Sequence, residues 1–140
     1  MRWVIRFVVV VAVIAAMAVG FCLYQGITTS LHAENVLHAA LLTVQLLNEY
    51  VILHDGKWPQ SWSDLEKLPP KERMGMYDWP EESREVQQYV EVDFSADPES
   101  VAKHGVAEFN AVRPIGPFYP FKDRGSVEEL LKAIRKHTSQ

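Results

Sequence analysis

Few side chains in this 140-residue chain have the types and spacing that chemistry requires. The five histidines are scattered, with no HxxxH or HExxH spacing, and Glu34 with His38 would supply only two metal ligands from one helix face. There is no GxSxG motif and no glycine-rich phosphate loop, and the single cysteine, Cys22, lies inside an apolar run. The sequence therefore predicts no catalytic residue, no metal and no cofactor.

Two weaker patterns leave an enzyme and a calcium site as alternatives. An enzyme would need the acid and base candidates near residues 97 to 104, Asp97 and His104, to converge in a pocket. Asp93, Asp97 and Glu99 could gather oxygens around calcium, but the segment lacks the glycine and spacing of an EF-hand. A helix cap and a solvated loop are the favoured interpretation of these acids.

Composition narrows the function classes. Lys and Arg number 14 against 18 Asp and Glu, which gives a net charge of −4, and the two signs alternate from Lys57 onward without a basic stripe. Nucleic-acid binding is therefore not predicted. One cysteine allows no intrachain disulfide. The chain has room for one small domain with a modest core.

The N-terminal apolar run organises the rest of the chain. Phe7 to Tyr24 supplies 18 residues without a charge, close to the roughly 20 residues that a helix needs to cross the hydrocarbon core. Backbone groups in lipid must bond internally, so the segment must be a helix. We predict a transmembrane anchor over residues 1–25, with the lipid bilayer as its partner.

Flanking residues indicate the orientation. Arg2 and Arg6 precede the run and the next basic residue is Lys57, so the N-terminus is predicted in the cytoplasm and residues 26–140 form an extracytoplasmic domain. Trp3 and Tyr24 lie at the two ends, as interfacial aromatics do. The alternative is a cleavable signal peptide with a small-x-small site at residues 16–18. The run exceeds a typical signal-peptide core, which favours the anchor.

A long amphipathic helix is predicted over residues 30–55. Gln25-Gly26 is a candidate break before it, and Thr28, Thr29 and Ser30 are candidate N-caps. Fused to the span, it would instead make one helix of about 50 residues. Asp55-Gly56 predicts its end. Apolar residues recur along it at spacings of three and four and form one seam: Leu37, Ala40, Val44, Leu47, Val51 and His54, widened by Val36, Leu41, Leu46 and Tyr50.

This apolar face has two interpretations. We favour packing against the helix's own domain, and the alternative is self-association or binding of a protein partner. Trp58 and Trp62, with Leu65, are predicted to pack on the end of the long helix, with ligand stacking as the alternative. The candidate interaction residues are Leu37, Val44, Leu47, Val51, Trp58 and Trp62.

A short helix and a loop follow. Ser61 with Asp64 resembles a capping box and predicts a helix to about Leu68, stopped by Pro69-Pro70. Residues 71–85 are charged and contain turn signals, which indicates a surface loop. Four apolar side chains are expected to dock this loop on the domain: Met74, Met76, Tyr77 and Trp79.

The small sheet and the C-terminal helix are predicted within residues 86–138. Alternation predicts strands over 90–94 and 107–111, with a short helix capped by Asp97 between them. Three prolines within 113–124 limit that segment to an edge strand or a packed loop. A helix over 127–137 is predicted from a capping box of Ser126 with Glu129, and its apolar face comprises Val127, Leu130, Leu131 and Ile134.

The predicted fold class is α+β: a transmembrane helix continuing into a long amphipathic helix packed on a small antiparallel sheet, with a C-terminal helix. This layout, with the turn Gly56-Lys57-Trp58-Pro59, resembles type IV pilins and type II secretion pseudopilins over about residues 7 to 68. The resemblance implies an assembly subunit. In those families a Gly-Phe processing site precedes the apolar stretch, with a glutamate as the fifth mature residue. Here Gly20-Phe21 follows most of the stretch, and Gln25 occupies the glutamate position.

The predicted function is that of a single-pass membrane protein with a small, non-catalytic extracytoplasmic domain for binding or structure. The alternative is a pilin-like assembly subunit of a secretion or pilus system.

Overall fold

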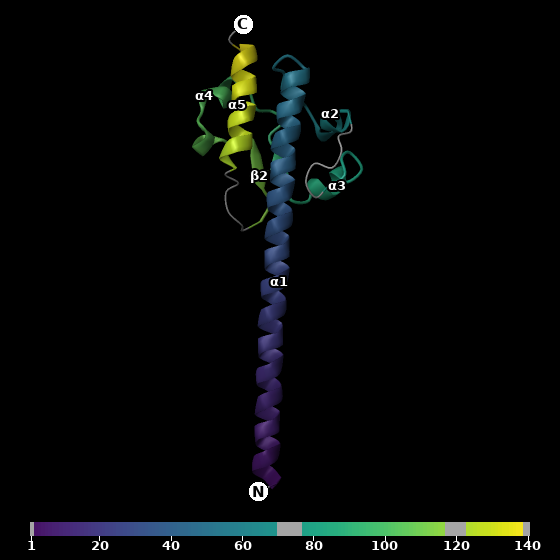
Figure 1. Cartoon of the computed structure of the whole chain (residues 1–140), viewed down its shortest axis with the longest axis vertical. Helices are drawn as coiled ribbons and strands as arrows, with labels where there is room; N and C mark the ends of the chain where they lie inside the picture. Colours follow the sequence, from purple (N-terminus) through teal and green to yellow (C-terminus); the bar gives the residue numbers. More distant parts are fainter. Residues whose placement is uncertain (1, 70–76, 117–122, 139–140) are drawn as a thin grey trace. The chain divides into compact units, whose positions relative to one another are not determined.

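A computed structural model describes residues 2–69, 77–116 and 123–138 of the chain. It has an α+β architecture, with a long first helix, a two-stranded antiparallel sheet and a C-terminal helix (Figure 1). The chain divides into two compact units, residues 1–34 and 35–140. The boundary predicted between residues 25 and 26 falls inside the first unit.

The first helix, α1, runs from Arg2 to Leu53 without interruption. The break predicted at Gln25-Gly26 is wrong, and the alternative of one fused helix is confirmed. Thr28 is not an N-cap: its hydroxyl donates to the carbonyls of Tyr24 and Gln25, at 3.0 Å each. One glycine costs a helix only about 1 kcal/mol, which propagation from both sides overcomes.

The end of α1 is confirmed. Asp55 and Gly56 have φ angles of 52° and 84°, the left-handed region that follows many helices. The Gly56 N–H donates to the Val51 carbonyl at 2.9 Å, which satisfies one of the last unpaired carbonyls of the helix. The chain therefore reverses at the residues that the sequence indicated.

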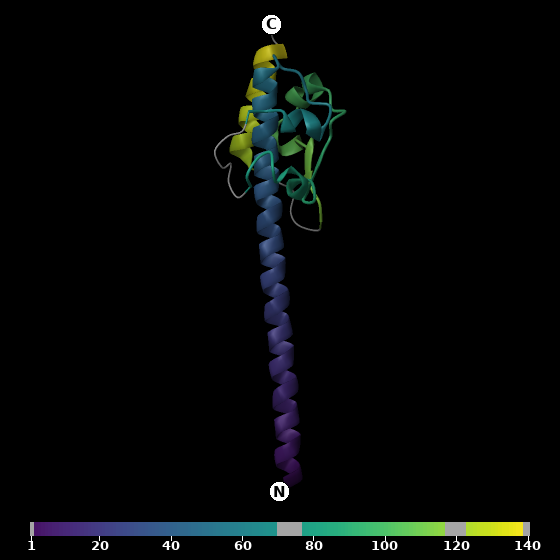
Figure 2. The same ribbon diagram turned by 90° about the vertical axis from the view of Figure 1, so that its right-hand side faces the viewer.

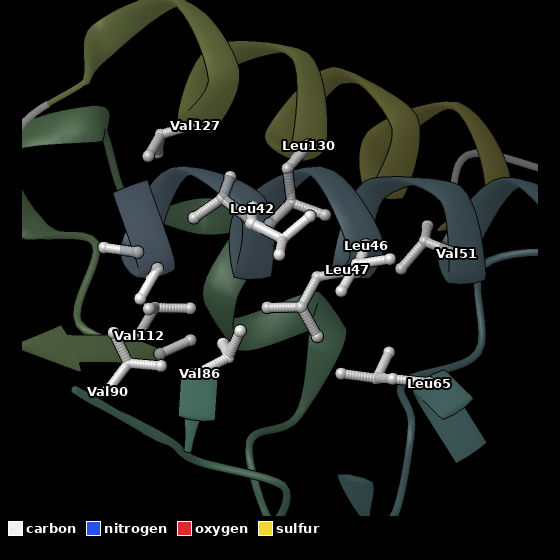
Figure 3. Close-up of a cluster of buried hydrophobic side chains, with 14 of the residues drawn as sticks. Leu42, Leu46, Leu47, Val51, Leu65, Val86, Val90, Val112, Val127 and Leu130 are labelled. Atoms are coloured by element: carbon white, nitrogen blue, oxygen red, sulfur yellow. The ribbon is translucent and has the colours of Figure 1, made fainter. Parts of the chain in front are cut away.

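The core of the second unit surrounds the part of α1 between Val36 and Val51. At 100° per residue, the buried positions cover about 200° of the helix circumference, twice the usual width of an apolar stripe. Figure 3 shows side chains of α1 pointing both toward the C-terminal helix and toward the short elements. The buried positions are Val36, Ala39, Ala40, Leu42, Thr43, Val44, Leu46, Leu47 and Val51.

The predicted seam follows only one flank of this buried surface. Ala40, Val44, Leu47 and Val51 are buried, which confirms packing on the domain. Leu37 is 49% exposed, contrary to the prediction, because it lies just beyond the edge of the buried arc. The second flank, which includes Ala39, Leu42, Thr43 and Leu46, widens the apolar stripe enough to need cover from two directions.

Two groups of elements cover this part of α1. The C-terminal helix α5, Arg124–Thr138, lies along one side of it, and most of the shorter elements lie along the other (Figure 2). Figure 3 shows Val127 and Leu130 of α5 directed toward Leu42, while Val86 and Leu65 lie across the helix from them. The second unit is therefore built around a central helix.

The apolar face of α5 is confirmed, since Val127, Leu130, Leu131 and Ile134 are all buried. Its predicted cap is wrong. The helix begins three residues before position 127, and the Asp123 carboxylate accepts the Ser126 N–H at 2.9 Å. An aspartate is as good an N-cap as a serine, so it takes the role when it lies one turn earlier.

Helix α2, Trp62–Glu66, is the predicted short helix. Its capping box does not form, because neither of the two reciprocal bonds between Ser61 and Asp64 is made. The Asp64 carboxylate accepts the Gln60 N–H at 3.0 Å, but the Ser61 hydroxyl accepts no backbone N–H and lies 3.3 Å from the same carboxylate. The Gln60 bond, and then the Lys67 ammonium, lower the pKa of Asp64.

The segment predicted as a surface loop contains a one-turn helix, α3, Ser83–Val86, which the charged sequence did not indicate. Tyr77 and Trp79 are buried against the core, as predicted. Met74 and Met76 lie outside the described residues. The Trp79 indole donates to the Leu65 carbonyl at 3.3 Å, and burial raises the pKa of Tyr77 to about 12.

The sheet consists of β1, Val90–Val92, paired antiparallel with β2, Val112–Pro114. The first predicted strand is confirmed, and the strand predicted over 107–111 is wrong. That segment begins with a 3-10 turn, η1, Val106–Glu108, and the partner strand comes from the proline-rich segment. Pro114, opposite Val90, is tolerated because each strand of a two-stranded sheet is an edge strand.

The packing of Gly56 yields a test. A Cβ at this position would lie 2.5 Å from the Cβ of His137 on α5, and φ is positive. We expect Gly56→Ala to lower the free energy of unfolding by more than about 1 kcal/mol, because an Ala with positive φ is strained and the contact must also open.

Gly105→Ala is the matched control. Its φ is −83°, and nothing lies within 4 Å of an added Cβ, so its stability should equal or slightly exceed that of the wild type. Urea unfolding of the purified chain in detergent measures both. Equal midpoints for the two variants would contradict the packing of α5 on the end of α1.

Candidate functional site

The surface of α1 between Phe7 and Tyr24 is apolar on every side. Its large apolar side chains are about half or more exposed, up to 67% at Tyr24. Successive residues such as Val8 to Val11 point in directions 100° apart, so no face is left polar. Of the helices that the structure describes, α1 is the one long and apolar enough to cross a membrane, and no part of its most apolar window is buried.

Charges are confined to the ends of this segment. Arg2 and Arg6 lie at the start, and the next formal charge is Glu34. Trp3 and Tyr24, 79% and 67% exposed, lie at the two ends of the most apolar part. This is the distribution of side chains that a bilayer favours, with aromatic residues at its two boundaries.

The second unit contains a hollow of about 230 Å³. The end of β1, the helix α4 (Pro98–Lys103) and the segment after η1 form its walls. Asp97 and His104, the acid and base candidates of the sequence, both line it, as do Asp93, Glu108 and Asn110. The condition that these two residues share a pocket is therefore met.

The polar groups of the hollow serve local structure, however. The Asp97 carboxylate caps α4, as predicted, and accepts the N–H groups of Glu99 at 3.4 Å and Ser100 at 3.0 Å. Nδ1 of His104 lies 2.8 Å from the Ser100 carbonyl oxygen. Both side chains are thus oriented along α4 by its own backbone.

Asp93 is held in the same way. Its carboxylate accepts the Ser95 hydroxyl at 2.6 Å and the Ser95 N–H at 3.0 Å, and these bonds lower the pKa of Asp93. Glu99 does not line the hollow. Among the residues that the structure describes, no three His, Cys, Asp or Glu side chains are placed to hold a metal ion, so the calcium alternative gains no geometric support.

The two tryptophans contact the chain's own strand end. The Trp58 indole is almost fully buried and donates to the Asp93 carbonyl at 2.9 Å. Trp62 is half-buried and meets Phe94 edge to face, with ring centroids 5.7 Å apart. Both rings therefore fix the turn after β1, and Trp58 has no face free for stacking a ligand.

The other candidate interaction residues divide by burial. Val44, Leu47 and Val51 are fully buried and cannot contact a second protein while the domain is folded. Leu37 is exposed and can. The structure thus leaves one of the four predicted helix residues on the surface.

Arg135 has a positioning role that sequence reasoning missed. Its guanidinium donates to the carbonyls of Ala102 at 2.9 Å and His104 at 3.2 Å, and so binds α5 to the C-terminal end of α4. Arg135 also lies in the last turn of its own helix. Its hydrogen bonds, however, place the cation at the C-terminal end of α4, where the helix dipole also favours a positive charge.

The role of Asp97 can be tested by substitution. Asp97→Ala should lower the free energy of unfolding by about 1 kcal/mol through loss of the cap, while Asp97→Asn should stay within a few tenths of the wild type. Chemical denaturation measures both variants. A large loss with Asn as well would show that the negative charge, and not the cap, is needed.

Asp93 predicts a pH dependence. Its folded pKa lies below the ordinary value of about 3.9, so its stabilising effect is complete above that value and is lost as the pH falls through the lower, folded pKa. Asp93→Asn keeps an acceptor but cannot titrate. We expect the urea midpoint of this variant to fall less between pH 5 and about pH 3 than that of the wild type. If the urea midpoints of the variant and the wild type fell equally over this pH range, Asp93 would not be the source of the pH dependence.

No protein-family model, no curated protein and no solved structure matches this chain.

Proposed function

We propose that this chain is a single-pass membrane protein with an extracytoplasmic domain that binds or supports and does not catalyse. Residues 7–24 form the span, the N-terminus lies in the cytoplasm, and residues 35–140 form the folded unit outside.

The observation that carries the proposal is the exposure of large apolar side chains all around the first part of α1. Ten Phe, Val, Ile and Leu residues lie between positions 7 and 24. At about −0.3 to −0.6 kcal/mol each near the membrane centre, they favour insertion by roughly 3 to 6 kcal/mol. Arg6, at the edge, costs less than the roughly 3 kcal/mol of a central arginine.

The orientation is supported by the positive charges. Arg2 and Arg6 lie before the span, and no Lys or Arg follows it before Lys57. Basic residues within about 15 to 20 positions of a span are retained in the cytoplasm. The asymmetry at the two ends of this span is therefore the one typical of a cytoplasmic N-terminus.

The local hydrogen bonds of the side chains that line the hollow support a non-catalytic domain. Its Asp93, Asp97 and His104 side chains each bond to backbone or hydroxyl groups within four residues. A catalytic acid or base needs a side chain aimed at a substrate, with a partner that tunes it. These groups are instead oriented by the turns and the helix that they stabilise.

A second candidate is a pilin-like assembly subunit, and the continuity of α1 favours it. An apolar segment that continues without a break into the core helix of a small domain is the architecture that the resemblance implied. The mass of the mature protein separates the candidates. An intact N-terminus supports the anchor, cleavage near Gly20 with a methylated Phe21 supports the pilin-like subunit, and cleavage after Ala18 supports a signal peptide.

The anchor can be tested with charges in the span. Val10→Arg with Ile14→Arg should add roughly 5 to 7 kcal/mol to the insertion free energy, enough to outweigh the apolar side chains. We expect the double variant to leave the membrane fraction on alkaline carbonate extraction, and the wild type and a Val10→Leu, Ile14→Leu control to remain.

A reporter that is active only outside the cytoplasm, fused after Gln140, tests the orientation. It should be active on the wild type and on the leucine control. Retention of the arginine variant in the membrane would refute the span, and cytoplasmic activity of the complementary reporter would refute the orientation.

A further inference from the structure

We propose that the face of α1 formed by Tyr24, Ile27 and Leu31 lies in the headgroup layer of the outer leaflet, with lipid headgroups and the adjoining acyl chains as its partner. The inference rests on the proposed anchor, but it concerns residues beyond the span and can fail while the anchor stands.

Lengths along the helix place this face. Trp3 and Tyr24 are separated by about 32 Å of helix at 1.5 Å per residue, close to the 30 Å of the hydrocarbon core. Tyr24 then lies at the outer boundary of the core. The next seven residues rise about 10 Å further, and the headgroup layer of one leaflet is roughly 5 to 8 Å thick. Ile27 lies within that layer, and the backbone of Leu31 lies a few ångströms beyond it, so only the side chain of Leu31, inclined back toward the span, reaches its outer edge.

The helix itself is suited to a layer poor in free water. It continues through Gly26 without a break, so its backbone groups are paired internally. The Thr28 hydroxyl donates back to the carbonyls of Tyr24 and Gln25 and needs no water partner. No formal charge occurs between Arg6 and Glu34.

The segment is also two-sided. At 100° per residue, Ile27 and Leu31 lie on one side of the helix, and Thr29, between them in depth, lies on the opposite side. Ile27 and Leu31 are 60% and 56% exposed within their own unit. Side chains on a helix tilt toward its N-terminus, which here is the direction of the span. The side chains of Ile27 and Leu31 therefore reach back toward the lipid, and being apolar they favour it, whereas the hydroxyl of Thr29 favours water.

Depth measurements with single cysteines test the proposal. In a Cys22→Ala background, cysteines replace Ile27 and Leu31, with Thr29 as the control of similar depth on the opposite side. Val13 is the control within the span and the exposed Gln45 the control in water. Each full-length variant, reconstituted in phosphatidylcholine vesicles, is labelled with a membrane-impermeant maleimide and, separately, with an environment-sensitive fluorophore. Quenching is compared between lipids with a nitroxide at the headgroup and at the acyl-chain end.

We expect the cysteines at 27 and 31 to react roughly tenfold more slowly than that at 45, since lipid headgroups surround them and hinder the reagent, and more slowly than that at 29. Their fluorophores should be quenched most by the headgroup nitroxide, and that at 13 by the chain-end nitroxide. Reaction at 27 and 31 as fast as at 29 or 45, with 13 still protected, would overturn this proposal alone. Free reaction at 13 would overturn the anchor as well.

Discussion

The apolar arc of α1 between Val36 and Val51 is the constraint on which the folded unit depends. It covers about 200° of the helix, and a stripe this wide cannot be buried by one neighbouring element. Helix α5 covers one flank, through residues such as Leu130, and the short elements around Leu65 and Val86 cover the other. The positions of the sheet and of the short helices follow from this need for cover on two sides.

Because the short elements are too small to be stable alone, specific polar contacts fix their ends. The Trp58 indole binds the Asp93 carbonyl, and the Arg135 guanidinium binds the end of α4. Aspartates cap the starts of α4 and α5. Such contacts are each worth about 1 kcal/mol, so several together matter in a small domain whose one cysteine lies outside the folded unit. The hollow beside α4 is a product of these turns.

Helix α1 is stabilised by two different environments along its length. In residues 7–24 all sides are apolar, and we propose that lipid surrounds them. From Asn35 onward the buried positions form an arc, and protein covers it. The backbone hydrogen bonding is the same in both parts, since a helix pairs its backbone groups internally whatever surrounds it. The change of environment is carried by side chains alone, so α1 needs no break between the two parts.

Periodicity in the sequence was sufficient where an element's residues alternate strongly between apolar and polar. The face of α5 and the first strand at Val90 could be predicted for this reason, and the end of α1 could be predicted from residues that tolerate a left-handed conformation, Asp55 and Gly56. The errors arose where two local signals competed. Asp123 and Ser126 are both good caps for α5, and only the packed position of the helix selects one. The alternation over 107–111 is typical of a strand, but the residue that pairs with Val92 of β1 is Val112, which lies just beyond it.

What the sequence alone determined is the type of each segment: an uninterrupted apolar run, an amphipathic helix, and short helices and strands separated by turn residues. It also contains no recognisable catalytic motif. These properties depend on residues that are close together in the sequence, and the sequence gives the order of those residues directly. Only the tertiary structure decided that a second flank of α1 is also buried, why Leu37 is exposed, which strand pairs with β1, and that Asp97 and His104 share a hollow. Those outcomes depend on contacts between residues far apart in the chain, and local patterns carry no information about which of several compatible partners will pack there.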